Sequence, residues 1–190
     1  MDTGLSLLIV GVALWAASHL FKRLAPGPRG AMEDGTARLV VTVMSVVALI
    51  LMVLGYRWAE IIPVYSPMAG MGHLTDLLML IAFVIFGAGM SKGVLWTKIR
   101  HPMLTGVIVW SVAHLLVNGD LASLILFGGI GLWAILSMLL INAQAGAWVR
   151  PAAGGARRDL ALVAIAAVMY ALVAGVHIWL GHNPFVGTYG

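Results

Sequence analysis

Six long runs of apolar residues follow one another along the chain, and short segments between them hold most of the charged residues. Each run is continuous, and most have about 16 to 22 residues, close to the length that an α-helix needs to cross a bilayer. Continuous runs favour helices over the strands of a membrane barrel, in which alternate residues are polar. The pattern predicts transmembrane helices over about residues 5–21, 39–55, 72–90, 103–117, 121–141 and 160–180.

Residues that favour helix ends agree with several of these boundaries. Pro102 suits the first position of the fourth helix, where its missing N–H removes no hydrogen bond. Asn118 and Gly119 favour a tight turn into the fifth helix, and Asp159 can cap the start of the sixth. Basic residues follow the first apolar run, so we interpret it as a retained helix and not as a signal peptide. We expect residues 1–190 to form one domain of the all-α class, a polytopic membrane bundle of six transmembrane helices.

Composition supports the same class of protein. Hydrophobic residues make up 62% of the 190 residues and charged residues only 9%, whereas about a quarter of the residues in an average soluble protein are charged. Lipid suits such a chain, provided that the backbone polar groups are satisfied within helices. The chain has no cysteine, which excludes disulfides and thiolate ligands. It also lacks the Gly-x-Ser-x-Gly, His-Glu-x-x-His and P-loop motifs, which argues against the hydrolases and nucleotide-binding proteins that carry them.

Basic residues are distributed unevenly between the two sides of the predicted bundle. Of the 11 Lys and Arg residues, only Arg57 lies outside three alternate connections between helices. Short basic loops stay in the cytoplasm, so we expect a bacterial inner-membrane protein with both termini periplasmic. The net charge of +4 then reflects topology and not nucleic-acid binding, and the expected partners are membrane lipid and a lipophilic small molecule. The three basic connections hold Lys22, Arg23, Arg29 and Arg38, then Lys92, Lys98 and Arg100, and finally Arg150, Arg157 and Arg158.

The six histidines are the main candidates for chemistry inside the membrane, where ionisable side chains are rare and often functional. Imidazole is a common iron ligand, and two imidazoles from facing helices can hold a b-type haem. The alternative for each histidine is a hydrogen bond that only bridges helices. His19 and His101 are expected toward the cytoplasm. The polar residues expected toward the outer side are His73, Asp76, His114, Asn118, Asp120, His177 and His182.

His114 is the firmest ligand candidate, because it lies well inside its predicted helix. Trp110 and Ser111 precede it by four and three residues, which places all three on one side of the helix. Asp76 follows His73 by three residues and could orient its ring by accepting the second imidazole N–H. A carboxylate in the first turn of a helix also suits the helix dipole without any ligand. Both interpretations of Asp76 stay open.

Several stretches of the sequence resemble the NnrU family of small integral membrane proteins. They extend over almost the whole chain, and the stretch in the fourth predicted helix is the most specific. The stretches are Arg100-His101-Pro102-Met103-Leu104-Thr105-Gly106, Trp110-x-x-x-His114-Leu115, Asn118-Gly119-Asp120, Ser18-His19 with Arg23, Gly72-His73-Leu74 and His182-x-Pro184-Phe185-Val186-Gly187.

The resemblance implies a membrane protein that is associated with denitrification in some bacteria and has no defined biochemical activity. The family is similar to 15-cis-zeta-carotene isomerase, a b-haem protein that isomerises a central cis double bond of a carotenoid. Carried over from that enzyme, the two haem ligands are His19 and His114. The isomerase has a cysteine three residues before its second ligand, and Ser111 stands there in this chain.

Residue depth leads to a different partner for His114. His19 lies about 21 Å along the first helix, toward the cytoplasm, whereas His114 is expected toward the outer side. His73 matches the depth of His114 better. His19 and His73 are therefore alternatives for the second axial position of haem b.

Three functions are compatible with these observations. The first is a haem-b protein that carries out cis-trans isomerase or redox chemistry on a lipid-soluble, carotenoid-like substrate, or acts in nitrogen-oxide metabolism. The second is a non-catalytic accessory protein for denitrification. The third is a methyltransferase, because Arg100-His101-Pro102 also resembles a segment of isoprenylcysteine and phospholipid methyltransferases. A cationic helix start that reaches the lipid headgroups is the simpler interpretation of Arg100 and His101.

Overall fold

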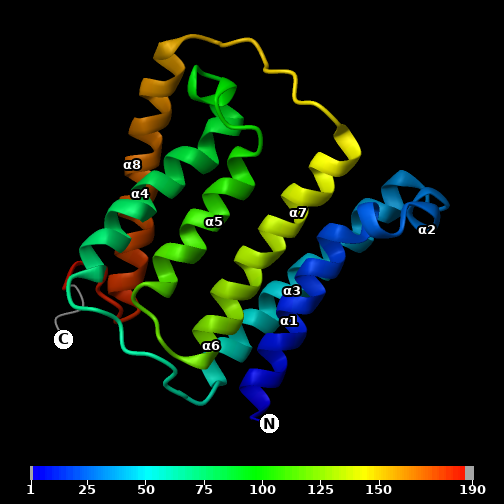
Figure 1. Cartoon of the computed structure of the whole chain (residues 1–190). Coiled ribbons are helices and arrows are strands. Elements are labelled where there is room, and N and C mark those ends of the chain that lie inside the picture. Colours follow the sequence, from blue (N-terminus) through cyan, green and yellow to red (C-terminus); the bar gives the residue numbers. More distant parts are fainter. Residues whose placement is uncertain (1, 187–190) are drawn as a thin grey trace. The chain divides into compact units, whose positions relative to one another are not determined.

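The computed structural model describes residues 2–186, and these residues form an all-α structure (Figure 1). Within this range the only extended pairing is an isolated bridge between Pro63 and Asp120. Gly187, the last residue of the C-terminal family stretch, lies outside the described residues. The helices are α1 (Thr3–Leu24), α2 (Pro26–Gly30), α3 (Asp34–Trp58), α4 (Met71–Ser91), α5 (Pro102–Leu115), α6 (Leu121–Ser123), α7 (Gly129–Ala145) and α8 (Ala156–Trp179), with shorter turns η1 (Leu95–Thr97), η2 (Leu124–Gly128) and η3 (Pro184–Val186).

Five helical segments are long and apolar enough to cross a membrane. They are α1, α3, α4, α8 and the continuous run Leu121–Ala145, in which a π-helical turn, η2, joins α6 to α7. α5 is apolar but has only 14 residues, about 21 Å of helix against about 30 Å of hydrocarbon core. The chain is therefore a multi-pass helical membrane protein with five candidate spans, and the sixth predicted crossing depends on α5.

Local hydrogen bonds explain where α5 begins and ends. Pro102 is its first residue, as predicted. The helix ends at Leu115, two residues before the predicted limit of 117. Both the backbone N–H of Asn118 (3.0 Å) and its side-chain amide (2.8 Å) donate to the carbonyl of His114, which closes the helix there.

Asp159 does not cap α8, and this prediction was wrong. α8 begins at Ala156, earlier than the apolar run, because polar residues continue the helix beyond its apolar part. Asp159 therefore lies one turn inside α8. Its carboxylate accepts the backbone N–H groups of Val94 (2.7 Å) and Leu95 (3.2 Å) and so holds the segment that precedes η1.

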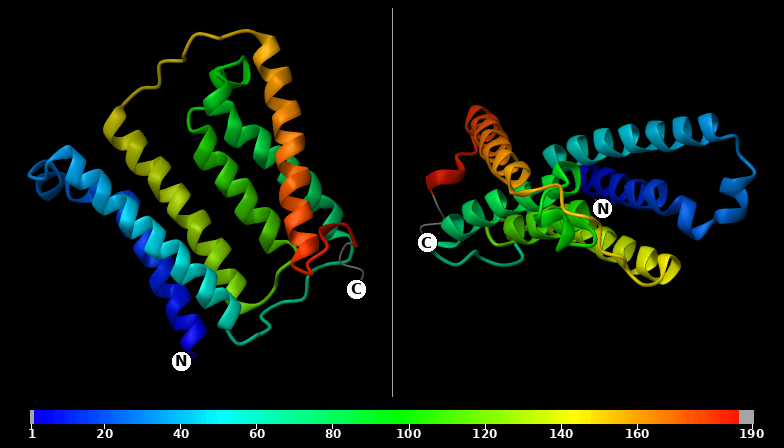
Figure 2. Two further views of the ribbon diagram at one scale, coloured as in Figure 1. Left: turned by 180° about the vertical axis from the view of Figure 1, so that it is seen from behind. Right: turned by 90° about the horizontal axis from the view of Figure 1, so that it is seen from above.

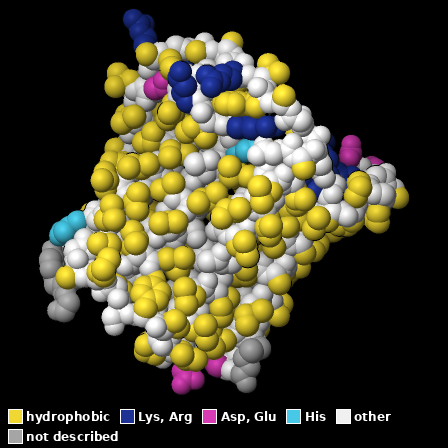
Figure 3. All heavy atoms as spheres, in the orientation of Figure 1, with side chains coloured by type: hydrophobic (Ala, Val, Ile, Leu, Met, Phe, Trp, Pro, Cys, Tyr) yellow, Lys and Arg dark blue, Asp and Glu magenta, His cyan; other side chains and the backbone are white. Residues whose placement is uncertain are grey.

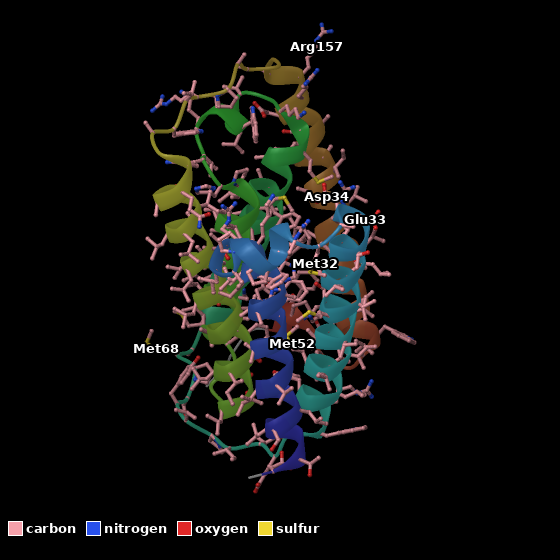
Figure 4. All side chains as sticks on the ribbon, turned by 90° about the vertical axis from the view of Figure 1, so that its right-hand side faces the viewer. Met32, Glu33, Asp34, Met52, Met68 and Arg157 are labelled. Carbon is pink, nitrogen blue, oxygen red and sulfur yellow. The ribbon has the colours of Figure 1, made fainter. Side chains whose placement is uncertain are left out.

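The structure divides into two compact units. The first contains α1 to α3 with the chain as far as Tyr65, and also Gly119–Trp133. In this unit α1 and α3 lie side by side (Figure 2). Gly11 permits the close approach, because a Cβ at that position would lie 2.8 Å from the backbone nitrogen of Met52. Met52 is buried and points from α3 toward α1 (Figure 4).

The second unit contains Ser66–Asn118 and the chain from Ala134 onward. Here α4 packs against α5 and α8 and runs antiparallel to both. Its last turns meet the beginning of α5, where Gly89 faces the ring of Pro102. Its first turns meet the end of α5, where the Thr75 hydroxyl donates to the carbonyl of Ala113 (2.8 Å). The start of α4 and the ends of α5 and α8 therefore lie together at one end of this unit.

Large apolar side chains lie on the outside of the helices, whereas small residues fill the contacts between them. Hydrophobic side chains cover most of the face shown in Figure 3. Val168 and Leu172 on α8 are 60% and 59% exposed. Ala48 and Ala113 are fully buried. This inside-out distribution is typical of helices that pack through small residues and face lipid.

Candidate functional site

Three histidines are held in the same way by their own helices. The Nδ1 atoms of His19, His114 and His177 lie 2.9, 2.9 and 2.8 Å from the carbonyl oxygens of the residues four positions earlier. A carbonyl can only accept, so each Nδ1 carries the proton, and in the neutral ring the lone pair is on Nε2. Metal-ligating histidines commonly have this arrangement, in which the N–H opposite the metal donates to a carbonyl.

A tryptophan accompanies two of these histidines at identical spacing. The ring of Trp15 stacks on His19 at 4.1 Å between centroids, and the ring of Trp110 lies 5.0 Å from that of His114. Both pairs belong to a Trp-x-x-x-His-Leu segment, one in α1 and one in α5. The sequence interpretation used only the second segment, although the repeated spacing was the signal that could have revealed both.

In the first unit, an aromatic cluster surrounds His19. Trp133 meets the His19 ring edge-on at 5.2 Å and the Trp15 ring at 5.6 Å. Within residues 2–186, the indole N–H groups of Trp15 and Trp133 are buried and have no hydrogen-bond partner. His19 itself is exposed on α1, one turn before the basic residues that end the helix. The cluster therefore leaves an imidazole accessible beside two indoles.

In the second unit, His114 lies in the last turn of α5 and is half-buried. Ser111 is buried one turn earlier. Asn118 donates to the main-chain carbonyl of His114 and so fixes the end of the helix that carries the histidine. His177 on α8 interacts electrostatically with His114.

His73 and Asp76 lie in the first turns of α4, at the same end of the second unit. Asp76 accepts a hydrogen bond from the hydroxyl of Tyr170 on α8 and also interacts electrostatically with His73. The ring of Phe185 lies 6.3 Å from that of Tyr170. The sequence interpretation missed Tyr170, for which the only signal was a hydroxyl within the apolar sixth run.

Arg100 and His101 connect the start of α5 to the end of α7. The Arg100 guanidinium donates to the carbonyl of Gly146 (2.7 Å), and the Nε2 of His101 lies 2.8 Å from the side-chain oxygen of Asn142. His101 therefore forms its hydrogen bond through Nε2. In His114 the same ring nitrogen carries no proton. Its contacts are those of a residue that joins two helices.

Asp120 belongs to a hydrogen-bonded chain in the first unit. Its carboxylate accepts hydrogen bonds from both the backbone N–H (2.9 Å) and the hydroxyl (2.6 Å) of Ser123, and so caps α6. The Ser123 oxygen in turn lies 2.8 Å from the hydroxyl of Tyr56. Burial raises the pKa of Tyr65 above its ordinary value, and the nearby Asp120 carboxylate raises it further. These contacts give Asp120 a structural role.

His182 follows α8 and is exposed. Its backbone N–H donates to the carbonyl of His177 (2.8 Å), which ends the helix. Within the described part of the chain, no three His, Asp or Glu side chains come together in a way that could hold a metal ion. A b-type haem is less demanding, because its porphyrin supplies four nitrogens and the protein adds only one or two axial ligands.

Comparison with protein families shows to which family the chain belongs. The family described as NnrU protein matches residues 7–184. The chain belongs to the NnrU family. Searches among curated proteins and among solved structures returned no match. The NnrU match includes both His19 and His114, and it confirms the resemblance seen in the sequence.

Proposed function

We propose that this NnrU-family protein binds haem b in a bacterial inner membrane, with His114 as an axial ligand. The proposed topology places the three basic connections in the cytoplasm and both termini in the periplasm. The observation that carries the proposal is the state of the His114 ring, whose Nδ1–H is bound to the carbonyl of Trp110 at 2.9 Å. That bond fixes the tautomer in which Nε2 can donate its lone pair to iron.

The donor set of this chain fits a haem better than a metal ion bound by protein alone. No group of three ionisable ligands occurs within residues 2–186, whereas histidines with an unprotonated Nε2 do occur. When bound, the haem would supply an iron centre able to exchange an electron or to polarise a ligand. The chain's own contribution is to hold the His114 ring in place through the carbonyl and the indole ring of Trp110. Ser111 in place of a cysteine excludes thiolate ligation at that position.

The second axial ligand has two candidates from the sequence. Similarity of the family to 15-cis-zeta-carotene isomerase favours His19, which lies in the first unit. Residue depth favours His73, which lies in the second unit with His114.

The proposed substrate class is lipid-soluble and carotenoid-like, because large apolar side chains are exposed along the helices and no charged binding cleft is needed for such a molecule. A role in nitrogen-oxide metabolism is the other setting that the NnrU resemblance suggests.

The absorbance spectrum of detergent-purified protein, produced with ample haem supply, tests the proposal. We expect a Soret band in the wild-type protein, strong reduction of that band in His114→Ala, and retention in His101→Ala. His101 is the matched control, because it immediately precedes the same helix but forms its hydrogen bond through Nε2. A band that persists in His114→Ala would contradict the assignment of the ligand.

If haem is bound, cis-trans isomerase activity can be tested directly. Purified protein would be incubated with cis-configured polyenes of the zeta-carotene type, and the isomer ratio would be measured by chromatography. We expect the ratio to change with the wild-type protein and not with His114→Ala. An unchanged ratio with haem-loaded wild-type protein would exclude these polyenes as substrates and leave redox chemistry.

A non-catalytic accessory function is the second candidate. It is favoured by the intrahelical bonds of His19, His114 and His177, which would also stabilise these rings in the absence of any ligand. Colourless wild-type protein under haem-rich expression would support it. Methyl transfer ranks third, since Arg100 and His101 are both engaged in contacts with the end of α7 and the loop after it.

A further inference from the structure

The end of the second unit where α4 begins contains a concentration of polar side chains that the proposed function only partly uses. α5 and α8 both terminate at this end, so the last turns of these two helices are neighbours of the first turns of α4. His114 is in the last turn of α5, and His177 is in the last turn of α8. Two imidazoles therefore lie at one end of a single compact unit.

His177 has the same local geometry as His114. Its Nδ1 lies 2.8 Å from the carbonyl of Val173, one turn earlier in α8. This bond places the proton on Nδ1 and the lone pair on Nε2, as in His114. The imidazole is half-buried. Both rings are thus prepared in the tautomer that binds iron through Nε2.

The other histidines at this end differ from His177. His73 lies in the first turn of α4, so the residue four positions earlier, Ala69, precedes the helix. Its charge interacts with Asp76, whose carboxylate also accepts the Tyr170 hydroxyl. His182 follows the end of α8 and is exposed. His177 also interacts electrostatically with His114.

We propose that His177 is the second axial ligand of the haem iron and binds it together with His114 from within the second unit. This inference rests on the proposed function, because it assigns a ligand to the same haem. It replaces both sequence candidates, His19 and His73, in that position. Two imidazoles on α5 and α8 would then join the ends of these helices through one iron atom.

Spectroscopy of four single variants tests this pairing. Wild-type protein and the Ala variants of His19, His73, His114 and His177 would be purified and compared by absorbance and electron paramagnetic resonance in the ferric state. Two imidazole ligands give a low-spin iron. We expect His177→Ala to retain haem and become high-spin, with added imidazole restoring the low-spin spectrum. We expect His19→Ala and His73→Ala to remain low-spin.

A second substitution guards against misfolding of the His177→Ala variant. His177→Met supplies a thioether ligand of similar length, so we expect it to remain low-spin with an altered spectrum. A His177→Ala spectrum identical to wild type, or a low-to-high-spin change in His19→Ala or His73→Ala instead, would overturn the inference and leave haem binding by His114 intact. Haem-free wild-type protein would overturn the proposed function and this inference with it.

Discussion

At the scale of single residues, the ring nitrogen that each histidine uses for its hydrogen bond separates the candidate ligands from the structural residues. His114 and His177 donate from Nδ1 to carbonyls within their own helices, whereas His101 interacts through Nε2 with another helix. Sequence spacing could identify His114, because a tryptophan precedes it by one turn. The sequence also placed His177 among the histidines toward the outer side. It could not pair His177 with His114 or identify Tyr170, because such pairings depend on how the helices pack.

Asp2 provides a pH-dependent contact at the residue scale. It lies before α1, and its carboxylate accepts the N–H groups of Glu60 (3.0 Å) and Leu5 (3.1 Å), which ties the start of α1 to the end of α3. These bonds, that of Glu60 foremost, lower the pKa of Asp2 below its ordinary value. The contact therefore stabilises the fold fully above the usual carboxylate pKa of about 3.9 and is lost as the pH falls through the lowered value.

We expect the difference in thermal stability between wild type and Asp2→Ala to be constant near neutral pH and to shrink on acidification below about pH 4. Circular dichroism in detergent over a pH series measures this difference. Asp2→Asn serves as the control, because it keeps an acceptor oxygen and has no charge to titrate. A wild-type advantage over Asp2→Ala that increased on acidification would contradict the assigned direction of the pKa shift.

Ser123 supports a second residue-scale prediction. It is fully buried, donates to Asp120, and lies within hydrogen-bond distance of the Tyr56 hydroxyl. Because a carboxylate can only accept, the Ser123 hydroxyl donates to Asp120 and accepts from Tyr56. Ser123→Ala should therefore destabilise the protein by about 1–3 kcal/mol, and Tyr56→Phe, which removes only one bond, by less. Equal stability of Ser123→Ala and wild type in denaturant titrations would show that the chain of hydrogen bonds contributes nothing.

At the scale of helices, the apolar runs predicted the position of every long helix, because the membrane imposes a length and a composition that are visible in the sequence. The ends were less predictable. α8 extends to Ala156 because Arg157 and its neighbours continue the helix beyond its apolar part. The Asp159 carboxylate accepts the backbone N–H groups of Val94 and Leu95. Side-chain hydrogen bonds to distant backbone groups decide such ends, and local sequence does not record them.

Close approach of α1 and α3 gives a prediction at the helix scale. A Cβ on Gly55 would lie 2.8 Å from the Cα atom of Leu8, so the backbones must separate to admit it. Gly55→Ala should destabilise the protein by about 1–3 kcal/mol, as overpacking does elsewhere. Gly175→Ala in α8 is the matched control, because no atom lies within 4 Å of the added Cβ. The melting temperatures of both variants in detergent provide the test, and a larger loss for Gly175→Ala would refute this packing.

At the scale of the whole molecule, the family match and the apolar helices agree with each other. Residues 7–184 match the NnrU family, and the described helices suit a multi-pass membrane protein. The sequence could predict the multi-pass helical class, because that class depends on the overall composition and on the lengths of the apolar runs. It could not predict the division into two units, which depends on which helices contact one another.

The absence of cysteine makes the proposed orientation easy to test. Ile61, between α3 and α4, is 81% exposed, and Val149, between α7 and α8, is 86% exposed. We expect a membrane-impermeant maleimide to label Ile61→Cys in intact spheroplasts and to label Val149→Cys only after permeabilisation. The cysteine-free parent is the control. The reverse labelling pattern would show that both termini are cytoplasmic.

The amount of haem b in the purified protein tests whether His114 holds a haem. The measurement is the molar ratio of haem b to protein, determined by the pyridine haemochrome method on detergent-purified wild type and His114→Ala produced under identical haem-rich conditions. We expect about one haem per chain in the wild type, the number that a single pair of axial imidazoles can hold, and a large loss of haem in His114→Ala. Wild-type protein that contains no haem, or a ratio unchanged by His114→Ala, would contradict it.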